Sequence, residues 1–354
     1  MTTVSPTPSP AMRLRELVFG AACAAAVRAA ARLGVADALD DEPAEAEELA
    51  AAIKAEPQPL RRLLHTLSCY GIFEETGDGR FVHTDMSRML RDDAPNSLRY
   101  IALWCTEPWT WDVWPRLDEA VRSGKSVFPD LYGKEFFTYL HQDAPESAHV
   151  FNRAMTTSSR QSAEEVAELL DLTGVTSVVD IGGGQGHVLA SLLERHPELC
   201  GTLLDLPEVV ENADPRLKEG GPLASRARIL PGDCRREVPV QADMYIIKNI
   251  LEWDDDSTRR TLRNVVGAAR PGARVVVIEN LVDDTPSMRF TTAMDLLLLL
   301  NVGGAKHTRE SLVGRMTDAG LQVGAVNPVN AYLHALESTV PAGERGRSRE
   351  LSDV

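Results

Sequence analysis

The chain has 354 residues, of which 44% are apolar and 25% are charged, and its formal net charge is −15. The length suits two domains and the composition is that of a soluble globular protein, while the acidic surplus argues against a nucleic-acid partner. The five cysteines are scattered without C-x-x-C spacing and no apolar run is long enough to span a membrane, so we expect a cytoplasmic protein without a disulfide framework, a metal site or a membrane partner.

The first hundred residues predict a disordered tail followed by helices. Residues 1–12 are rich in Ser, Thr and Pro, which is typical of disorder. Apolar residues then recur at helical spacing over residues 13–33, with many alanines that permit close helix packing, and Gly34 ends this helix. Two further helices are expected over residues 45–53 and 57–70.

A hairpin follows these helices, and the combination indicates a winged-helix domain over residues 13–100. Two alternating runs flank Asp78-Gly79, which is a strong hairpin signal. Winged helices often bind DNA, but residues 1–100 carry 11 basic and 15 acidic side chains, and a net charge of −4 attracts phosphate poorly. We therefore expect this domain to dimerise.

The next segment, residues 101–160, is expected to be a helical linker that contributes to a substrate pocket. Four of the five tryptophans lie within it, and one interpretation is that they fill a core between domains. The other is that some of the rings wall a pocket for a flat aromatic substrate. These tryptophans are Trp104, Trp109, Trp111 and Trp114.

Residues 161–340 alternate strand and helix patterns, which indicates a doubly wound parallel sheet. After a helix near residues 162–170, strands are expected over residues 177–181, 201–206, 227–230, 243–251 and 274–281, with an antiparallel pair over 321–336. Ligands of such α/β folds bind at the carboxyl ends of the strands. Polar residues follow each of the five parallel strands, and residues 341–354 are expected to form a flexible tail.

The glycine-rich turn after the first of these strands is the most informative motif. Gly182, Gly184 and Gly186 alternate behind Asp180, and a second strand ends in Asp205, an acid placed to hold a ribose. The dinucleotide fingerprint requires a third glycine where His187 stands. S-adenosylmethionine (SAM) is therefore the leading ligand, and the alternative is a turn that only packs helix on strand.

With these motifs the chain resembles the class II SAM-dependent O-methyltransferases of plants and antibiotic pathways. The resemblance covers residues 12–337 and includes the dimerisation domain. It implies a Rossmann-like SAM-binding domain with an N-terminal, mainly helical winged-helix dimerisation domain, and a homodimeric enzyme. The matching segments are Phe151-Asn152-Arg153-Ala154-Met155, residues 180–186, Leu204-Asp205-Leu206-Pro207, Pro231-Gly232-Asp233, Lys248-Asn249-Ile250-Leu251, Gly303-Gly304, and the run from Trp114 through Gly124 and Phe128.

The resemblance also implies roles for individual residues. The glycines would pass along the cofactor, Asp205 would hold the ribose, Asp233 the adenine amine, and Cys234 stands where the family usually has an aromatic residue that packs on the ring. The cofactor-binding candidates are Met155, Ser158, Gly182, Gly183, Gly184, Asp205, Leu206, Asp233, Cys234, Lys248 and Asn249. The substrate-binding candidates are Trp104, Trp111, Met155 and Asn301.

The chain departs from the family at the catalytic base. The family has a Leu-His-Asp-Trp or Leu-His-Glu-Trp run where this chain has Leu251-Glu252-Trp253, so the histidine is absent and the segment is one residue short. The family's first supporting acid matches Glu279, and its second falls on Lys306. Three explanations are open. Glu252 or His307 replaces the base, the acceptor needs no base, or the enzyme uses SAM for hydroxylation, decarboxylation or cyclisation. The plainer alternatives are that His307 faces solvent in a loop and that Glu252 caps the helix that begins near Asp254.

These observations predict a SAM-dependent methyltransferase that acts on a small aromatic or polycyclic secondary metabolite. O-methylation in natural-product biosynthesis is the leading interpretation, and C- or N-methylation and chemistry without methyl transfer stay open. A winged-helix regulator that senses a metabolite is the alternative from another class, and the charge balance disfavours it.

Overall fold

The structure is a computed structural model that describes residues 9–283 and 288–342 of the chain. It divides into two compact units, and each unit combines two stretches of the sequence. The first unit comprises Met1–Trp111 and Pro145–Thr157, and the second comprises Asp112–Ala144 and Ser158–Val354. The segment 101–160, expected as a linker, is thus divided between the two units.

The first unit is mainly helical and carries one short hairpin. Its core is built from the alanine face of α2 and the leucines of α4 and α5, closed by Phe73 and Phe81 of the hairpin. The order of helices followed by a hairpin is the one that the sequence predicts. Its elements are α1 (Pro10–Val18), α2 (Gly20–Leu33), α3 (Val35–Ala38), α4 (Ala46–Ile53), α5 (Pro57–Cys69), β1 (Phe73–Glu75), β2 (Phe81–His83), α6 (Asp85–Arg88), α7 (Arg99–Trp104), and the first residues of α8 (Pro108–Val113).

The expected first helix, residues 13–33, is instead two helices that meet at Phe19. The backbone leaves the helical conformation at Phe19 (φ −81°, ψ 6°), and Gly20, a weak helix former, begins α2. Helix α1 starts at Pro10 with the Ser9 side chain as its N-cap, so the expected tail of residues 1–12 ends earlier than predicted. The rest of that tail, and nearly all of the tail expected at residues 341–354, lie outside the described residues.

The second unit contains a seven-stranded sheet and the helices that cover it. Helix α12 begins in the first unit and ends in this one, so the helix expected near residues 162–170 is the last part of a longer helix. The elements are η1 (Trp114–Arg116), α9 (Leu117–Ser123), α10 (Phe128–Tyr132), α11 (Phe136–Gln142), α12 (Pro145–Leu169), β3 (Ser177–Ile181), α13 (His187–Arg195), β4 (Cys200–Asp205), α14 (Pro207–Val210), β5 (Ala227–Pro231), β6 (Met244–Lys248), α15 (Asp255–Ala268), β7 (Arg274–Glu279), α16 (Met288–Val302), α17 (Arg309–Asp318), β8 (Gln322–Pro328) and β9 (His334–Thr339).

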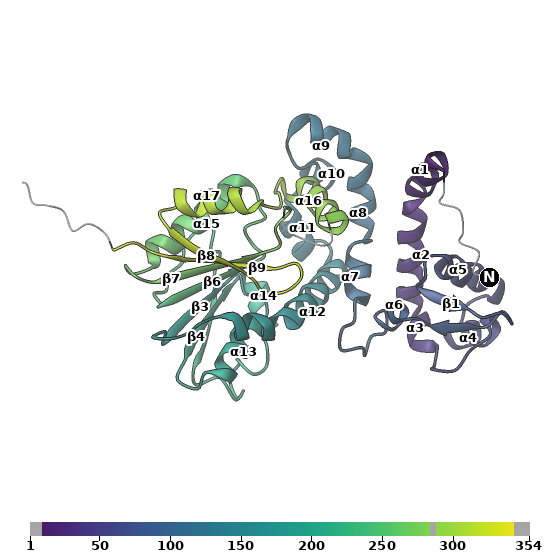
Figure 1. Cartoon of the computed structure of the whole chain (residues 1–354), viewed down its shortest axis with the longest axis horizontal. Coiled ribbons are helices and arrows are strands. Elements are labelled where there is room, and N and C mark those ends of the chain that lie inside the picture. The colour runs from purple at the N-terminus through teal and green to yellow at the C-terminus, as the bar shows by residue number, and fades with distance from the viewer. Residues whose placement is uncertain (1–8, 284–287, 343–354) are drawn as a thin grey trace, which may run out of the picture. The chain divides into compact units, whose positions relative to one another are not determined.

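The sheet has the strand order β5-β4-β3-β6-β7-β9-β8 and is parallel from β5 to β7. Its last two strands run antiparallel, as the sequence predicts for residues 321–336. Successive strand residues face opposite sides, so Val178 packs with α12 and α13 whereas Val179 packs with α15 and α17. Figure 1 shows α13 on one side of the strands and α15 and α17 on the other.

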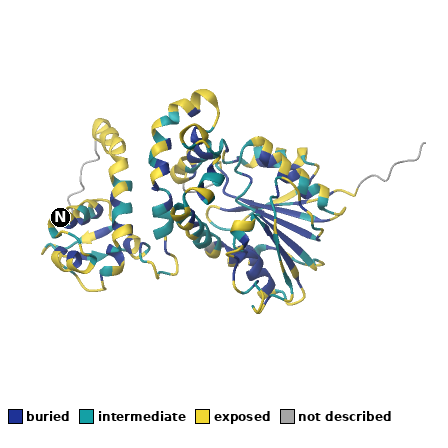
Figure 2. Cartoon of the chain, turned by 180° about the vertical axis from the view of Figure 1, so that it is seen from behind, coloured by how far each residue is buried: buried dark blue, intermediate teal, exposed yellow. Residues whose placement is uncertain are grey.

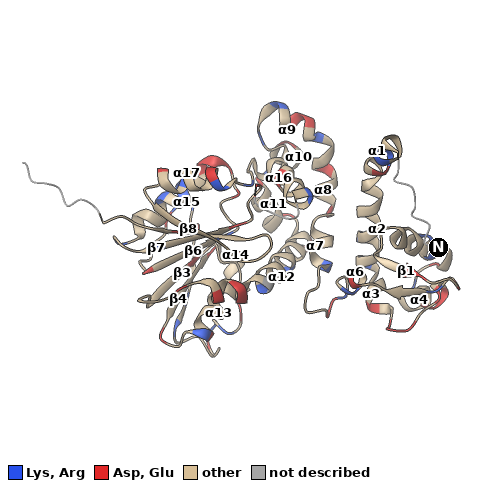
Figure 3. Ribbon diagram, viewed as in Figure 1, with Lys and Arg blue, Asp and Glu red and all other residues tan. Residues whose placement is uncertain are grey.

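Burial and charge agree with a sheet that is covered on both faces. Strands β3, β4, β6 and β7 are mostly buried in Figure 2, whereas the edge strand β5 is partly exposed. Figure 3 shows that charged side chains gather on helices and loops while the strands are nearly free of them. Near-continuous Val, Ile and Leu runs are typical of parallel strands buried on both sides. The strand expected over residues 243–251 ends earlier, at Lys248, because Asn249 adopts a left-handed backbone (φ 54°).

Candidate functional site

The strand order places a crevice between β3 and β6. From β3 the chain continues to β4 and β5 on one side of the sheet, and then to β6 and β7 on the other side. At such a reversal the loops that follow the two central strands diverge and leave a ligand site beyond their carboxyl ends. The glycine turn after β3 and Lys248-Asn249 after β6 border this crevice.

The glycine turn has the backbone that its sequence requires. Gly182, Gly184 and Gly186 have φ values of 61°, 63° and 82°, in the left-handed region that other residues rarely adopt. A Cβ on Gly182 would lie 2.7 Å from a methyl of Ile250, whereas one on Gly184 would meet nothing within 4 Å. The turn is therefore packed on one side and open at Gly184, where a ligand can approach the backbone.

Asp205, at the end of β4, is tied to this turn. Its Oδ2 accepts a hydrogen bond of 2.7 Å from the Gly184 N–H, and its Oδ1 accepts one of 2.7 Å from the Leu206 N–H. Burial raises the pKa of Asp205 to about 6 although both hydrogen bonds oppose the shift. The carboxylate is thus fixed beside the open glycine and keeps further lone pairs for a diol.

Two opposite charges lie deeper in the crevice. Asp180 is 1% exposed, and among the described residues its Oδ2 has no hydrogen-bond partner. Burial raises the pKa of Asp180 to about 7, against the opposing charge of Lys248, and burial lowers the pKa of Lys248. The ammonium of Lys248 lies 3.5 Å from the Ser159 hydroxyl, so Ser159, the neighbour of the predicted Ser158, contacts this lysine.

Asn249 holds a strained backbone at the edge of the crevice. A positive φ is uncommon for a residue other than glycine and costs free energy that the surrounding structure must supply. The side-chain Oδ1 of Asn249 is buried without a hydrogen-bond partner among the described residues. Strain together with an orphaned acceptor at a strand end is typical of a ligand-binding position.

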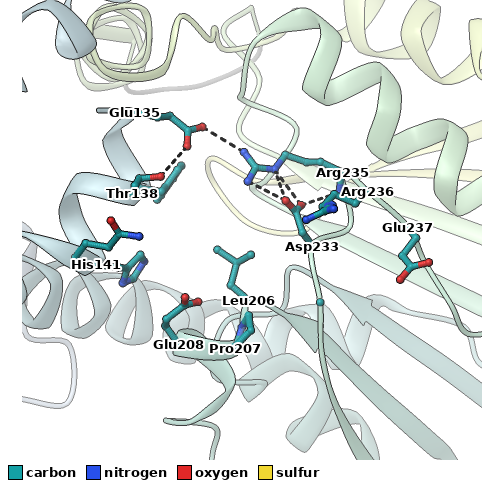
Figure 4. Close-up of a pocket in the computed structure, with 13 residues that line it drawn as sticks. Glu135, Thr138, His141, Leu206, Pro207, Glu208, Asp233, Arg235, Arg236 and Glu237 are labelled. Atoms are coloured by element: carbon teal, nitrogen blue, oxygen red, sulfur yellow. Dashed lines mark hydrogen bonds and ion pairs between the residues drawn. The ribbon is translucent and has the colours of Figure 1, made fainter. Parts of the chain in front are cut away.

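Asp233, after β5, lines a cavity of about 740 Å³ that Figure 4 shows. The Arg235 side chain holds both oxygens of Asp233 at 3.0–3.2 Å. Burial raises the pKa of Asp233, but the Arg235 hydrogen bonds and charge outweigh it and hold that pKa below its usual range. Cys234 is 5% exposed and its side chain packs in the core, so it presents little surface to the cavity.

The catalytic candidate Glu252 forms a buried ion pair with Lys306. The Lys306 ammonium contacts Glu252 Oε1, and the two side chains are only 8% and 12% exposed. Glu279, at the end of β7, is 1% exposed, and burial followed by the neighbouring Glu252 raises its pKa well above the usual range. The structure therefore brings two carboxylates together near Lys306, and the charge of Lys248 also acts on both of them.

Both plainer alternatives for these residues are wrong. Asp254, not Glu252, caps α15, because its side chain accepts hydrogen bonds from the Asp256 and Ser257 N–H groups. His307 does not face solvent: it is 5% exposed, and its Nε2 lies 2.6 Å from the Leu251 carbonyl oxygen. Because a carbonyl only accepts, this nitrogen donates and cannot take a proton.

His307 and Glu279 instead hold the residue before Glu252. Glu279 Oε1 accepts a hydrogen bond of 3.1 Å from the Leu251 N–H, while His307 donates to the Leu251 carbonyl. The turn at Gly304 packs on the same loop so closely that a Cβ there would overlap the Glu252 carbonyl oxygen. These contacts fix the backbone that carries Glu252.

The substrate-binding candidates divide between the two units. Trp104, Trp111 and Met155 belong to the first unit, so their contribution to the site stays a prediction. Asn301 lies near the end of α16 in the second unit, is 6% exposed, and has no hydrogen-bond partner for Oδ1 among the described residues.

The comparisons with known proteins agree with this geometry. The sequence matches the family pattern of the O-methyltransferase domain over residues 114–322 and that of the O-methyltransferase dimerisation domain over residues 15–93. The chain belongs to the O-methyltransferase family. This methyltransferase is 38% identical to the mitomycin biosynthesis 6-O-methyltransferase of Streptomyces lavendulae over 320 residues, which are 90% of this chain and 91% of the relative.

Two further relatives show the range of this family. The phenazine-1-carboxylate N-methyltransferase of Pseudomonas aeruginosa is 31% identical over 316 residues, 88% of this chain and 92% of the relative. The structure of the O-methyltransferase NcsB1 from neocarzinostatin biosynthesis, in complex with S-adenosylhomocysteine and 1,4-dihydroxy-2-naphthoic acid, has a TM-score of 0.76 and 32% identity. That match covers 90% of this chain and 96% of NcsB1.

The cofactor of this methyltransferase is SAM, and the crevice fits it. Gly184 leaves open backbone, the Asp205 carboxylate suits a ribose diol, and Asn249 offers a buried acceptor. Among the described residues, no group of three or more His, Cys, Asp or Glu side chains is arranged to hold a metal ion. Over the same part of the chain, every helix is too short or too polar to cross a bilayer.

Sequence reasoning missed two partners at the site. The sequence identified Lys306 only as the position where the family's second acid is absent, whereas in the structure it is the counterion of Glu252. Arg235 was not considered, yet it holds Asp233. The signal for the first was the loss of the histidine from the segment that carries Glu252 together with a lysine where the family has an acid, because these two changes leave an acid and a base that can pair.

Proposed function

We propose that this methyltransferase transfers the methyl group of SAM to a hydroxyl of a small aromatic or polycyclic acceptor in natural-product biosynthesis. The observation that carries the proposal is the Glu252–Lys306 pair, because it provides a carboxylate, held by a lysine, in the segment where the family carries its base. Of the relatives named above, one acts in mitomycin biosynthesis, one methylates phenazine-1-carboxylate, and NcsB1 binds 1,4-dihydroxy-2-naphthoic acid, which supports the acceptor class.

Bound SAM supplies an electrophilic methyl group, which an acceptor oxygen takes by in-line displacement at carbon. Glu252 accepts the proton of that hydroxyl on Oε2, since Lys306 occupies Oε1. The new bond joins the acceptor oxygen to the methyl carbon, the bond from that carbon to sulfur breaks, and its electron pair stays on sulfur. Glu279 and His307 act as positioning residues through Leu251.

A carboxylate base is weaker than the imidazole it replaces, which restricts the acceptor. The rate gained from a general base follows its basicity, so a weaker base assists best when the acceptor hydroxyl itself ionises readily. We therefore expect an acidic hydroxyl, such as that of a hydroxyquinone or a hydroxynaphthoic acid, rather than an ordinary phenol with a pKa of about 10. An aromatic nitrogen acceptor is the second candidate, because the phenazine relative is an N-methyltransferase.

The test is an assay of methyl transfer with two variants. Purified protein is incubated with SAM and 1,4-dihydroxy-2-naphthoic acid, and S-adenosylhomocysteine and methylated product are quantified by mass spectrometry. Glu252→Gln should lower turnover roughly 10²-fold while SAM affinity stays within about twofold. Glu310→Gln, which changes an exposed acid at the start of α17, is the matched control.

The outcomes separate the alternatives. A product without S-adenosylhomocysteine would show chemistry other than methyl transfer. Equal turnover of Glu252→Gln and the native enzyme would show that alignment alone drives the reaction and would remove Glu252 from its role. A methyl group on carbon or nitrogen in the product would correct the acceptor atom.

We also infer that the enzyme is a homodimer. Helix α1 and its C-cap Phe19 form an apolar surface that is unusual for a monomer. The side chains are those of Leu14, Leu17, Val18 and Phe19, which are 64–71% exposed. This helix begins just before and extends into the matched dimerisation domain, whose helices and hairpin have the order of a winged helix. All five cysteines are free thiols, which supports a cytoplasmic location.

A further inference from the structure

The cavity beside Asp233 has two facing walls, and a flat ring fits in the space between them. Helix α11 forms one side through residues that include Thr138 and His141. The loops after β4 and β5 form the rest, and Figure 4 shows the Leu206 side chain pointing into the cavity toward the guanidinium of Arg235. Asp233 lies at the edge between these two side chains.

Arg235 is held in place as a planar group. Its Nε and Nη2 donate to the two oxygens of Asp233, and Nη1 lies 3.4 Å from Glu135 Oε1 at the start of α11. Its guanidinium carbon also lies 5.3 Å from the centre of the Trp253 ring. Contacts on three sides fix the plane of the guanidinium before a ligand arrives, so little conformational entropy is lost on stacking.

Cys234, which lies between Asp233 and Arg235 in the sequence, cannot cover the face of an aromatic ring. The Cys234 side chain is buried in the core, and burial raises the pKa of its thiol to about 12, so it stays a small neutral group. Arg235 is thus the wide side chain next to Asp233 that lines the cavity.

We propose that the guanidinium of Arg235 stacks on the adenine ring of the cofactor, opposite Leu206, while Asp233 accepts a hydrogen bond from the adenine amine. The inference rests on the proposed function, in which SAM is the methyl donor, and on the family resemblance, which implies that Asp233 holds the adenine amine. Arginine stacks on aromatic faces and is attracted by their electron density. A carboxylate has about four lone-pair sites, so Asp233 holds Arg235 and the adenine amine together.

The test measures binding rather than turnover. Affinities for SAM, S-adenosylhomocysteine and 5′-methylthioadenosine are determined by titration calorimetry for the native protein, Arg235→Ala, Arg235→Phe and Arg235→Lys. Arg235→Ala should weaken all three ligands by the same factor, about tenfold, because they share the adenosine part. Arg235→Phe should restore affinity to within about threefold of native, and Arg235→Lys should not, because stacking needs a planar group.

Arg236→Ala is the matched control. Arg236 also lines the cavity and is exposed, so its loss removes the same charge without removing the stacked group, and affinity should change less than twofold. Native affinity in Arg235→Ala, or tighter binding because Asp233 is released, would overturn the inference. Rescue by lysine but not by phenylalanine would also overturn it, since charge alone would then act. Failure of the native protein to bind SAM would instead refute the proposed function.

Discussion

Replacing Lys306 by methionine tests whether the Glu252–Lys306 ion pair stabilises the loop that carries Glu252. Methionine keeps most of the lysine stem but removes the cation that contacts Glu252, so that Lys248 is left as the positive charge that acts on Glu252 and Glu279. Breaking a buried pair by removing one partner costs about 3–5 kcal/mol. Both side chains of the pair are nearly buried, so solvent screening does little to reduce this cost.

The double variant Lys306→Met/Glu252→Gln gives the decisive comparison. It removes both charges, so it should be more stable than Lys306→Met alone although it carries one more substitution. Glu252→Gln alone should cost less than Lys306→Met, because the nearby Glu279 then pairs with the lysine. The Lys306 charge is one of the causes that lower the pKa of Glu279.

The assay is calorimetric unfolding of the four proteins between pH 5 and pH 8. At 2–4 °C per kcal/mol, Lys306→Met should lower the melting temperature of the sheet unit by roughly 6–20 °C at pH 8. Without the Lys306 charge the pKa of Glu279 rises further, and a raised folded pKa means stability that is present at low pH and lost as pH rises. The deficit should therefore shrink toward pH 5. Additive losses in the double variant, or a deficit independent of pH, would refute this account.

Four further predictions concern the cofactor, the dimer and the buried charges. Asp205→Ala should weaken SAM binding at least tenfold in calorimetry, and unchanged affinity would move the ribose site elsewhere. Because the pKa of Asp205 is about 6, native SAM affinity should fall as pH drops from 7.5 to 5, whereas Asp205→Ala should show no such loss. Leu17→Asp/Phe19→Asp should give a monomer in light scattering, and a persistent dimer would assign the contact to another surface. The pKa of Asp180 is about 7, so its ionisation destabilises the folded protein progressively as the pH rises from about 4 to 7. In thermal unfolding, Asp180→Asn should therefore stabilise the protein by up to roughly 4 kcal/mol at pH 8 and by little at pH 4. Equal effects at both pH values would contradict the assignment.

The sequence alone determined the features that depend on neighbours along the chain. The strand Ser177–Ile181, the left-handed glycines after it and the helix beginning at His187 follow from apolar runs and from φ preferences within ten residues. The acid at the end of β4 was recognisable for the same reason. Where local preference was weak, as at Phe19 and Gly20, the boundary was missed.

Tertiary structure decided which side chains meet. Lys306 and Glu252 are 54 residues apart, and His307 and Leu251 are 56 apart, so no local pattern pairs them. They meet because the order of β3, β6 and β7 in the sheet brings the loops after these strands to one edge, where the turn at Gly304 packs on the Glu252 backbone. The strand order thus brings Glu252 and Lys306 together as a buried ion pair, in the place where the family's histidine and second acid are absent.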